Sequence, residues 1–201
     1  MTSSVKTTTS DSVRPPSVRR PSVRPPSVRP PSIPPPSRTG VEAASATDRF
    51  RLIGDYFPIL LSVSPLHYTE STVPEMGEAF EQYFIRGGRY VVIAVSPKHG
   101  EPPDAKQRKL VTDWIASPRV MSYSARLCLG SANIVPNALL RGLHTALLWA
   151  WNPPFPIKPV ASPREALDYA LEALELASVP PPRGAAGARA TIQRRLHEVM
   201  G

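Results

Sequence analysis

Apolar and polar residues recur from residue 50 onward at spacings that predict alternating strands and helices. Residues 90–95 form a continuous β-branched run, typical of a strand that is buried on both faces. Other segments place apolar residues three and four positions apart, as in amphipathic helices. We expect the apolar stripes of these helices to face the sheet, among them Leu110 in one helix and Leu139 and Leu140 in another. In chain order we expect two strands within 50–64, a helix at 72–86, a strand at 90–95, a helix at 104–117, a strand at 126–135, a helix at 137–151, a strand at 157–161 and a helix that opens at 162.

Turn and capping residues lie where these predicted elements begin and end. Gly54-Asp55 predicts a tight hairpin turn between the first two strands, and Gly87 follows the first helix as a C-terminal cap. Capping boxes are predicted for three helices, formed by Thr72 with Glu75, Asp104 with Gln107 and Ser162 with Glu165.

This order predicts an α/β fold. Strands that alternate with helices of 12–16 residues favour a parallel sheet with right-handed crossovers, and the initial hairpin adds an antiparallel strand. Pro58 and Pro159 restrict their strands to a strand start or a sheet edge. We therefore expect a mixed, mostly parallel sheet of four to five strands with about four helices.

The basic charge of the chain is concentrated at its ends. From Ser12 a five-residue Ser-Val-Arg-Pro-Pro repeat begins, and residues 1–40 carry seven Lys and Arg against one Asp, a net of +6 out of +8 for the whole chain. We predict a disordered repeat tail at 1–47, a folded domain at 48–178, and a linker with a short basic helix at 179–201.

The tail is open to several interpretations. It can be an unmodified polyproline spacer, or a basic segment that contacts an anionic surface such as an acidic protein, a lipid or a nucleic acid. An arginine three residues before serine also resembles the target sites of basophilic kinases. This pattern makes phosphorylation candidates of Ser17, Ser22, Ser27 and Ser32.

Two helices offer surfaces for a protein partner. Arg141, Leu148 and Trp149 lie on the side of the 138–151 helix away from its main apolar arc, so they form a candidate interface, unless Trp149 packs against neighbouring loops. Gly142 in the middle of this helix suggests the close approach of another backbone. In the C-terminal helix, Ile192 and Leu196 line the apolar side. That helix either docks onto a partner or folds back onto its own domain.

The element order and the segment from Asn133 to Trp149 resemble the STAS fold of anti-sigma-factor antagonists and small bacterial STAS-like proteins. That resemblance implies a regulatory, signalling role through protein–protein contact. The antagonists carry a phosphorylated serine directly after an aspartate, whereas here Ala105 follows Asp104. The resemblance therefore implies a STAS-like domain without this phospho-switch.

Polar residues at the ends of the predicted strands form the remaining candidate site. In open α/β sheets ligands bind outside the carboxyl ends of the strands. These ends offer Ser64, His67, Ser96, Lys98, His99 and Asn137.

The sequence holds no nucleophile elbow, phosphate-binding glycine loop or paired metal ligands, so we expect no cofactor and no metal. The lone Cys128 is expected to be a buried apolar residue. With no apolar leader and no membrane-spanning run, we expect a soluble cytoplasmic protein. The leading hypothesis is a non-enzymatic regulatory or scaffolding module that binds another protein. The alternatives are a small-ligand-binding protein or enzyme that uses the strand-end loops, and a nucleic-acid-associated protein.

Overall fold

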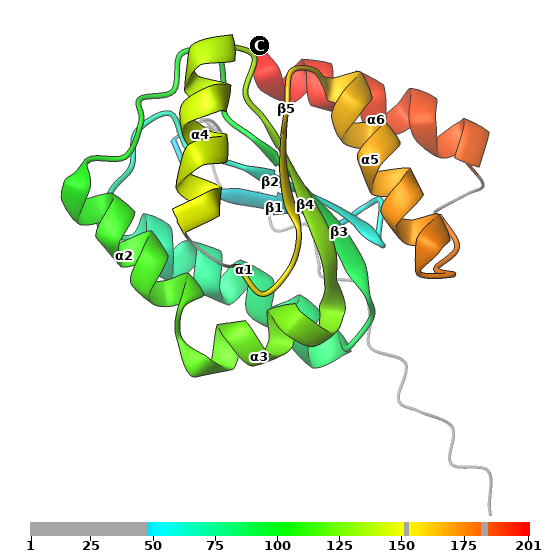
Figure 1. Ribbon diagram of the computed structural model, residues 1–201, viewed down its shortest axis with the longest axis horizontal. Coiled ribbons are helices and arrows are strands. Elements are labelled where there is room, and N and C mark those ends of the chain that lie inside the picture. Colours follow the sequence, from blue (N-terminus) through cyan, green and yellow to red (C-terminus); the bar gives the residue numbers. More distant parts are fainter. Residues whose placement is uncertain (1–47, 151–152, 182–184) are drawn as a thin grey trace, which may run out of the picture. The chain divides into compact units, whose positions relative to one another are not determined.

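The computed structural model describes residues 48–150, 153–181 and 185–201, and these form five strands and six helices (Figure 1). In chain order the elements are β1 (Arg51–Ile53), β2 (Ile59–Val63), α1 (Thr72–Arg86), β3 (Tyr90–Val95), α2 (Ala105–Ile115), α3 (Pro118–Leu127), β4 (Cys128–Ile134), α4 (Ala138–Ala150), β5 (Ile157–Val160), α5 (Pro163–Leu176) and α6 (Ala185–Met200). The repeat tail and its four candidate phosphorylation sites lie outside the described residues.

The strands form one sheet in the order β1-β2-β3-β4-β5. β1 pairs antiparallel with β2, and every other neighbouring pair is parallel. This confirms the predicted mixed, mostly parallel α/β fold. Pro58 directly precedes β2, and Pro159 lies in the edge strand β5, as the absence of a backbone donor in proline requires.

Helices cover both faces of the sheet. α1, α2, α3 and α4 lie on one face, and α5 and α6 lie on the other (Figure 1). The first group consists of the connections between successive parallel strands, and right-handed crossovers place such connections on the same side when the strand order follows the sequence. The last two helices follow the final strand and pack on the side that remains.

The face under α5 and α6 is filled by aliphatic side chains. A row across the sheet joins Leu61, Ile93 and Ala132, and each of these is fully buried. From α6, Ile192 and Leu196 pack into the same core and are 0% exposed. α6 therefore belongs to the compact unit of residues 43–201, and the predicted boundary at 178 divides one hydrophobic core.

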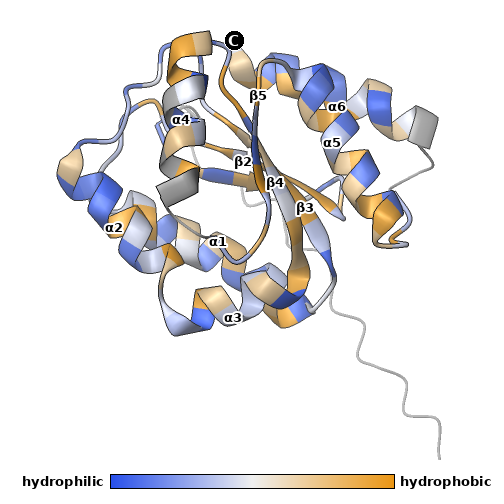
Figure 2. Ribbon diagram, viewed as in Figure 1, coloured by the Kyte–Doolittle hydropathy of each residue, from blue (hydrophilic) through white to orange (hydrophobic). Residues whose placement is uncertain are grey.

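The opposite face is rich in aromatic residues. The ring centroid of Phe80 in α1 lies 6.4 Å from that of Phe50, 6.2 Å from that of Phe84 and 5.8 Å from that of Trp114 in α2. Phe84 also stacks on Tyr123 of α3 at 5.0 Å. In the hydropathy colouring of Figure 2, α2 shows several hydrophilic residues.

Helix caps were largely predictable. Asp104 and Gln107 form the complete capping box of α2, and the Ser162 side chain accepts a hydrogen bond from the Glu165 amide at the start of α5. Asn137 accepts from the first amides of α4, and Gly87 ends α1 at φ 74°. At α1 the predicted cap is wrong, because Ser71, not Thr72, is the N-cap residue.

Helix α3 was not predicted, and the strand expected at 126–135 begins only at Cys128 because α3 continues to Leu127. α3 buries Val120, Ser124 and Leu127, which are four and three residues apart and so share one face of a helix. The expected tight turn at Gly54 is instead a connection of five residues between β1 and β2.

Helices α2 and α4 are less buried than the sequence predicted. α2 has no buried residue, and Leu110 of its expected buried stripe is 37% exposed. In α4, Leu139 and Leu140 were expected to face the sheet but are 82% and 54% exposed. α4 lies beside the edge strand β5, so only part of its surface meets the sheet (Figure 1).

Candidate ligand-binding cavity

A cavity of about 330 Å³ lies between the sheet and the helices of its aromatic face. Its floor is a row of small and polar residues, Ser62, Ala94 and Asn133, which are aligned across β2, β3 and β4. The neighbouring row on the opposite face carries Leu61 and Ile93 among its members, so the two faces differ mainly in side-chain volume. The cavity exists because the floor residues are too small to fill the space below α2 and α4.

The walls of the cavity are mostly apolar. They come from α1, α2 and α3, from the segment before β5, and from the strands themselves. Their large side chains are Phe50, Met76, Phe80, Phe84, Tyr90, Val92, Val111, Trp114, Ile115, Val120, Phe155 and Ile157. Val111, Trp114 and Ile115 are only half-buried because they face this space instead of a packed core.

Polar side chains gather toward the carboxyl ends of the strands. The Tyr68 hydroxyl donates to the Ser64 Oγ atom at 3.1 Å, and the Ser131 hydroxyl donates to the Asn133 Oδ1 atom at 2.8 Å. With its oxygen engaged, Asn133 retains an amide nitrogen with two donors. Among the described residues, none accepts a hydrogen bond from that nitrogen. This amide can therefore donate to a molecule in the cavity.

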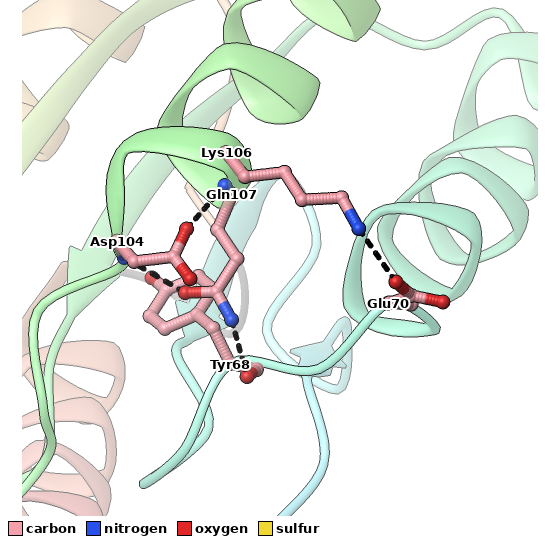
Figure 3. Close-up of polar contacts among 5 residues, drawn as sticks. All are labelled: Tyr68, Glu70, Asp104, Lys106 and Gln107. Atoms are coloured by element: carbon pink, nitrogen blue, oxygen red, sulfur yellow. Dashed lines mark hydrogen bonds and ion pairs between the residues drawn. The ribbon is translucent and has the colours of Figure 1, made fainter.

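The loop that carries Tyr68 is fixed by the start of α2 (Figure 3). Gln107, a member of the capping box, donates from Nε2 to the Tyr68 carbonyl oxygen at 2.6 Å. Beside it, Lys106 binds the Glu70 carboxylate at 2.7 Å, and this hydrogen bond lowers the pKa of Glu70. Together these contacts hold one polar wall of the cavity in place.

His144 and Cys128 also line the cavity, and burial favours the uncharged form of each. Loss of water around the half-buried His144 of α4 lowers its pKa, so the neutral imidazole is favoured. Burial raises the pKa of the Cys128 thiol to about 12. A thiol in that state is a poor nucleophile, so Cys128 acts as an apolar wall residue, in agreement with the prediction that it is buried.

The six predicted strand-end residues do not form one site. Ser64 lines the cavity, but His67 is exposed and lies 3.4 Å from the Glu101 carboxylate. Ser96, Lys98 and His99 are exposed. Asn137 is occupied in capping α4. The predicted pocket therefore contributes a single residue to the cavity that the structure contains.

The predicted interface residues are likewise separated. Arg141 donates to the carbonyl oxygens of Val135 and Pro136, and Leu148 is half-buried. The Trp149 side chain lies outside the described part of the structure. Ile192 and Leu196 are core residues, so of the two alternatives for the C-terminal helix the structure shows the one in which it folds back onto its own domain.

Sequence reasoning missed most of the polar residues of the cavity, namely Ser62, Tyr68, Ser124, Ser131, Asn133 and His144. One signal was available. Ser62, Ala94 and Asn133 are small or polar residues inside strands that are otherwise strongly apolar. Such positions leave space or unused hydrogen-bonding groups within a sheet.

No protein-family model, no curated protein and no solved structure matches this chain. The STAS-like resemblance therefore stays a prediction. Among the described residues, no cluster of three or more His, Cys, Asp or Glu could hold a metal ion. None of the helices within the described ranges is long and apolar enough to cross a membrane.

Proposed function

We propose that the folded unit is a non-enzymatic module that binds a small, mainly apolar molecule in the cavity on the aromatic face of the sheet. The observation that carries this proposal is the cavity itself. A volume of about 330 Å³ falls within the range of ligand sites. Its mostly apolar walls with a minority of polar groups are also typical of such sites.

The polar groups favour binding over catalysis. General-base activation of a serine requires a hydrogen bond from its hydroxyl to a base. Here the Ser64 oxygen accepts from Tyr68, and the Ser131 hydroxyl donates to the Asn133 amide. The Cys128 thiol is held in its protonated form. These residues can orient a ligand but are not arranged to activate a nucleophile.

The proposal is tested by filling the cavity from its floor. Ala94→Leu places a larger apolar side chain in the open space, so the protein should remain folded while binding is lost. We expect the affinity for N-phenylnaphthylamine, an uncharged fluorescent probe, to fall at least about tenfold, or ~1.4 kcal/mol. Ala190→Leu makes the same change at an exposed position of α6 and is the matched control. Equal probe binding by both variants would contradict the proposal.

A second function, recognition of a protein partner in a STAS-like regulatory role, is supported by one surface feature. Leu139 and Leu140, in the first turn of α4, are the most exposed large apolar residues among those described in that helix, with 82% and 54% of their surface exposed. Exposed apolar residues of this kind occur at protein interfaces. In this proposal the basic tails add a second, charge-dependent contact.

The partner hypothesis predicts that captured proteins depend on this turn. Full-length protein and the double variant Leu139→Ser, Leu140→Ser should be compared as baits, with Leu176→Ser as the control at another exposed leucine. A partner retained by the control and lost with the double variant supports recognition through α4. If both variants capture the same proteins as the unmodified chain, this surface is not the interface.

A further inference from the structure

We infer, building on the proposed binding function, that the ligand of the cavity is an uncharged molecule, with an apolar body and one hydrogen-bonding head such as a hydroxyl, carbonyl or amide group. The inference rests on the charge of the cavity wall and on the type of polar group in that wall. It also rests on how the charged residues of the surrounding elements are already engaged.

The wall of the cavity holds no fixed charge. None of the described residues that line it is a Lys, Arg, Asp or Glu, and burial favours the neutral form of the lining His144. A carboxylate or an ammonium group in this space would lose its water without gaining an opposite charge. The cavity therefore disfavours acids and amines relative to neutral molecules of the same shape.

Several charged residues on the helices around the cavity have partners outside it. On α2, Lys106 pairs with Glu70 and remains 70% exposed, and Lys109 pairs with Asp113. On α4, the Arg141 guanidinium donates to two backbone carbonyl oxygens. These side chains are satisfied where they are, so recruiting one to a charged ligand would break an existing contact.

The polar groups in the wall suit a neutral head. Asn133 offers amide donors, and the paired hydroxyls of Tyr68 and Ser64 can both donate and accept. An alcohol, which also donates and accepts, can satisfy such groups without any change of protonation. A carboxylate at this position could only accept, and an ammonium group could only donate.

The apolar part of the wall indicates the body of the ligand. Phe80 and Trp114 are tilted by 46° with ring centroids 5.8 Å apart, and the ring centroid of Phe50 lies 6.4 Å from that of Phe80. Aromatic walls of this kind pack well against ring systems. Ligands with a naphthyl body are therefore suitable probes.

The experiment compares three probes that share one body and differ only in the head. Naphthylmethanol, naphthoate and naphthylmethylammonium, substituted at the same ring position, are titrated into the full-length protein at neutral pH by calorimetry. We expect the alcohol to bind at least about tenfold more tightly than either ion. Equal or tighter binding of an ion overturns the inference and leaves the binding function in place. If none of the three binds, the proposed function fails together with the inference.

A charge introduced into the wall provides the second test. Asn133→Asp replaces the amide by a carboxylate of the same shape. It should weaken binding of the alcohol and strengthen binding of the ammonium probe. Gln82→Glu makes the same chemical change at an exposed position of α1 and should alter neither. Unchanged selectivity in Asn133→Asp overturns the assignment of the ligand head to this end of the cavity.

Discussion

Two glycines in helix α4 and strand β4 show how much the surroundings of a residue decide its role. A Cβ atom at Gly130 would lie 2.2 Å from the Tyr169 hydroxyl and 3.3 Å from the Pro156 carbonyl oxygen. A Cβ atom at Gly142 would meet none of the described atoms within 4 Å. The expectation that Gly142 marks a close backbone contact is therefore wrong. At Gly130, for which nothing was predicted, the nearby Tyr169 hydroxyl leaves no room for a side chain.

Alanine at these two positions should have opposite effects on stability. Gly142→Ala removes the conformational freedom of glycine from a helix without a clash, and should stabilise the protein by up to about 1 kcal/mol. Gly130→Ala forces Tyr169 to move and should destabilise it by roughly 1–3 kcal/mol. Urea denaturation of both variants checks the signs. A loss of stability in Gly142→Ala would contradict the open space that the structure shows around Gly142.

His144 should make stability depend on pH. Burial lowers its pKa in the folded protein, whereas in the unfolded chain it titrates near its ordinary value of about 6.5. As the pH falls through that value, the unfolded chain binds a proton that the folded protein does not. The free energy of unfolding therefore keeps its full contribution from His144 above about pH 6.5. This contribution declines as the pH falls from that value to the lower pKa that His144 has in the folded protein.

The measurement is the denaturation midpoint of His144→Gln between neutral and mildly acidic pH. This variant should lose less stability on acidification than the unmodified protein. His197→Gln, at an exposed position of α6, is the matched control, and its pH profile should follow that of the unmodified chain. Identical profiles for all three proteins would show that His144 is not protected from protonation by the fold.

At the scale of elements, the sequence pattern of α6 predicts that the segment is a helix but not which surface the helix packs against. Apolar residues at helical spacing correctly predicted a helix at 188–200, but an amphipathic helix that docks on a partner has the same pattern as one that packs on its own domain. The structure places Ala188, Ile192, Leu196 and Val199 in the core, and the Lys98 amide donates to the Met200 carbonyl oxygen. The missing information was tertiary, because no local signal tells which surface an apolar stripe will meet.

Removing part of this stripe should destabilise the folded unit. Leu196 is 0% exposed, so Leu196→Ala should lower the free energy of unfolding by roughly 2–5 kcal/mol, through lost burial and a new cavity. Arg194→Ala, at an exposed position of the same helix, controls for changes in helix propensity and should have little effect. Denaturation by urea measures both. A Leu196→Ala protein as stable as the control would mean that α6 does not contribute to the core.

At the scale of the whole molecule, the mixed, mostly parallel sheet followed from the alternation of strand and helix patterns. Helix α3 did not, because the polar Ser124 stands in its buried stripe between Val120 and Leu127, although Ser117-Pro118 is a typical helix start. The cavity could be foreseen only in part. The small residues Ser62, Ala94 and Asn133 are visible in the sequence, but their alignment depends on the pairing of three strands.

The charge of the chain is divided unevenly between the tail and the rest, and this leads to a prediction about anionic surfaces. Residues 1–40 carry +6 of the total of +8, so their deletion leaves residues 41–201 with +2. Because the compact unit comprises residues 43–201, the shortened protein should unfold at the same urea concentration as the full chain. Its binding to mixed-sequence duplex DNA, used here as a polyanion, should become weaker and less dependent on salt, since fewer phosphates are neutralised. Retention of both affinity and salt dependence after the deletion would instead assign the anionic contact to the folded unit, and a lowered unfolding midpoint would assign the tail a structural role.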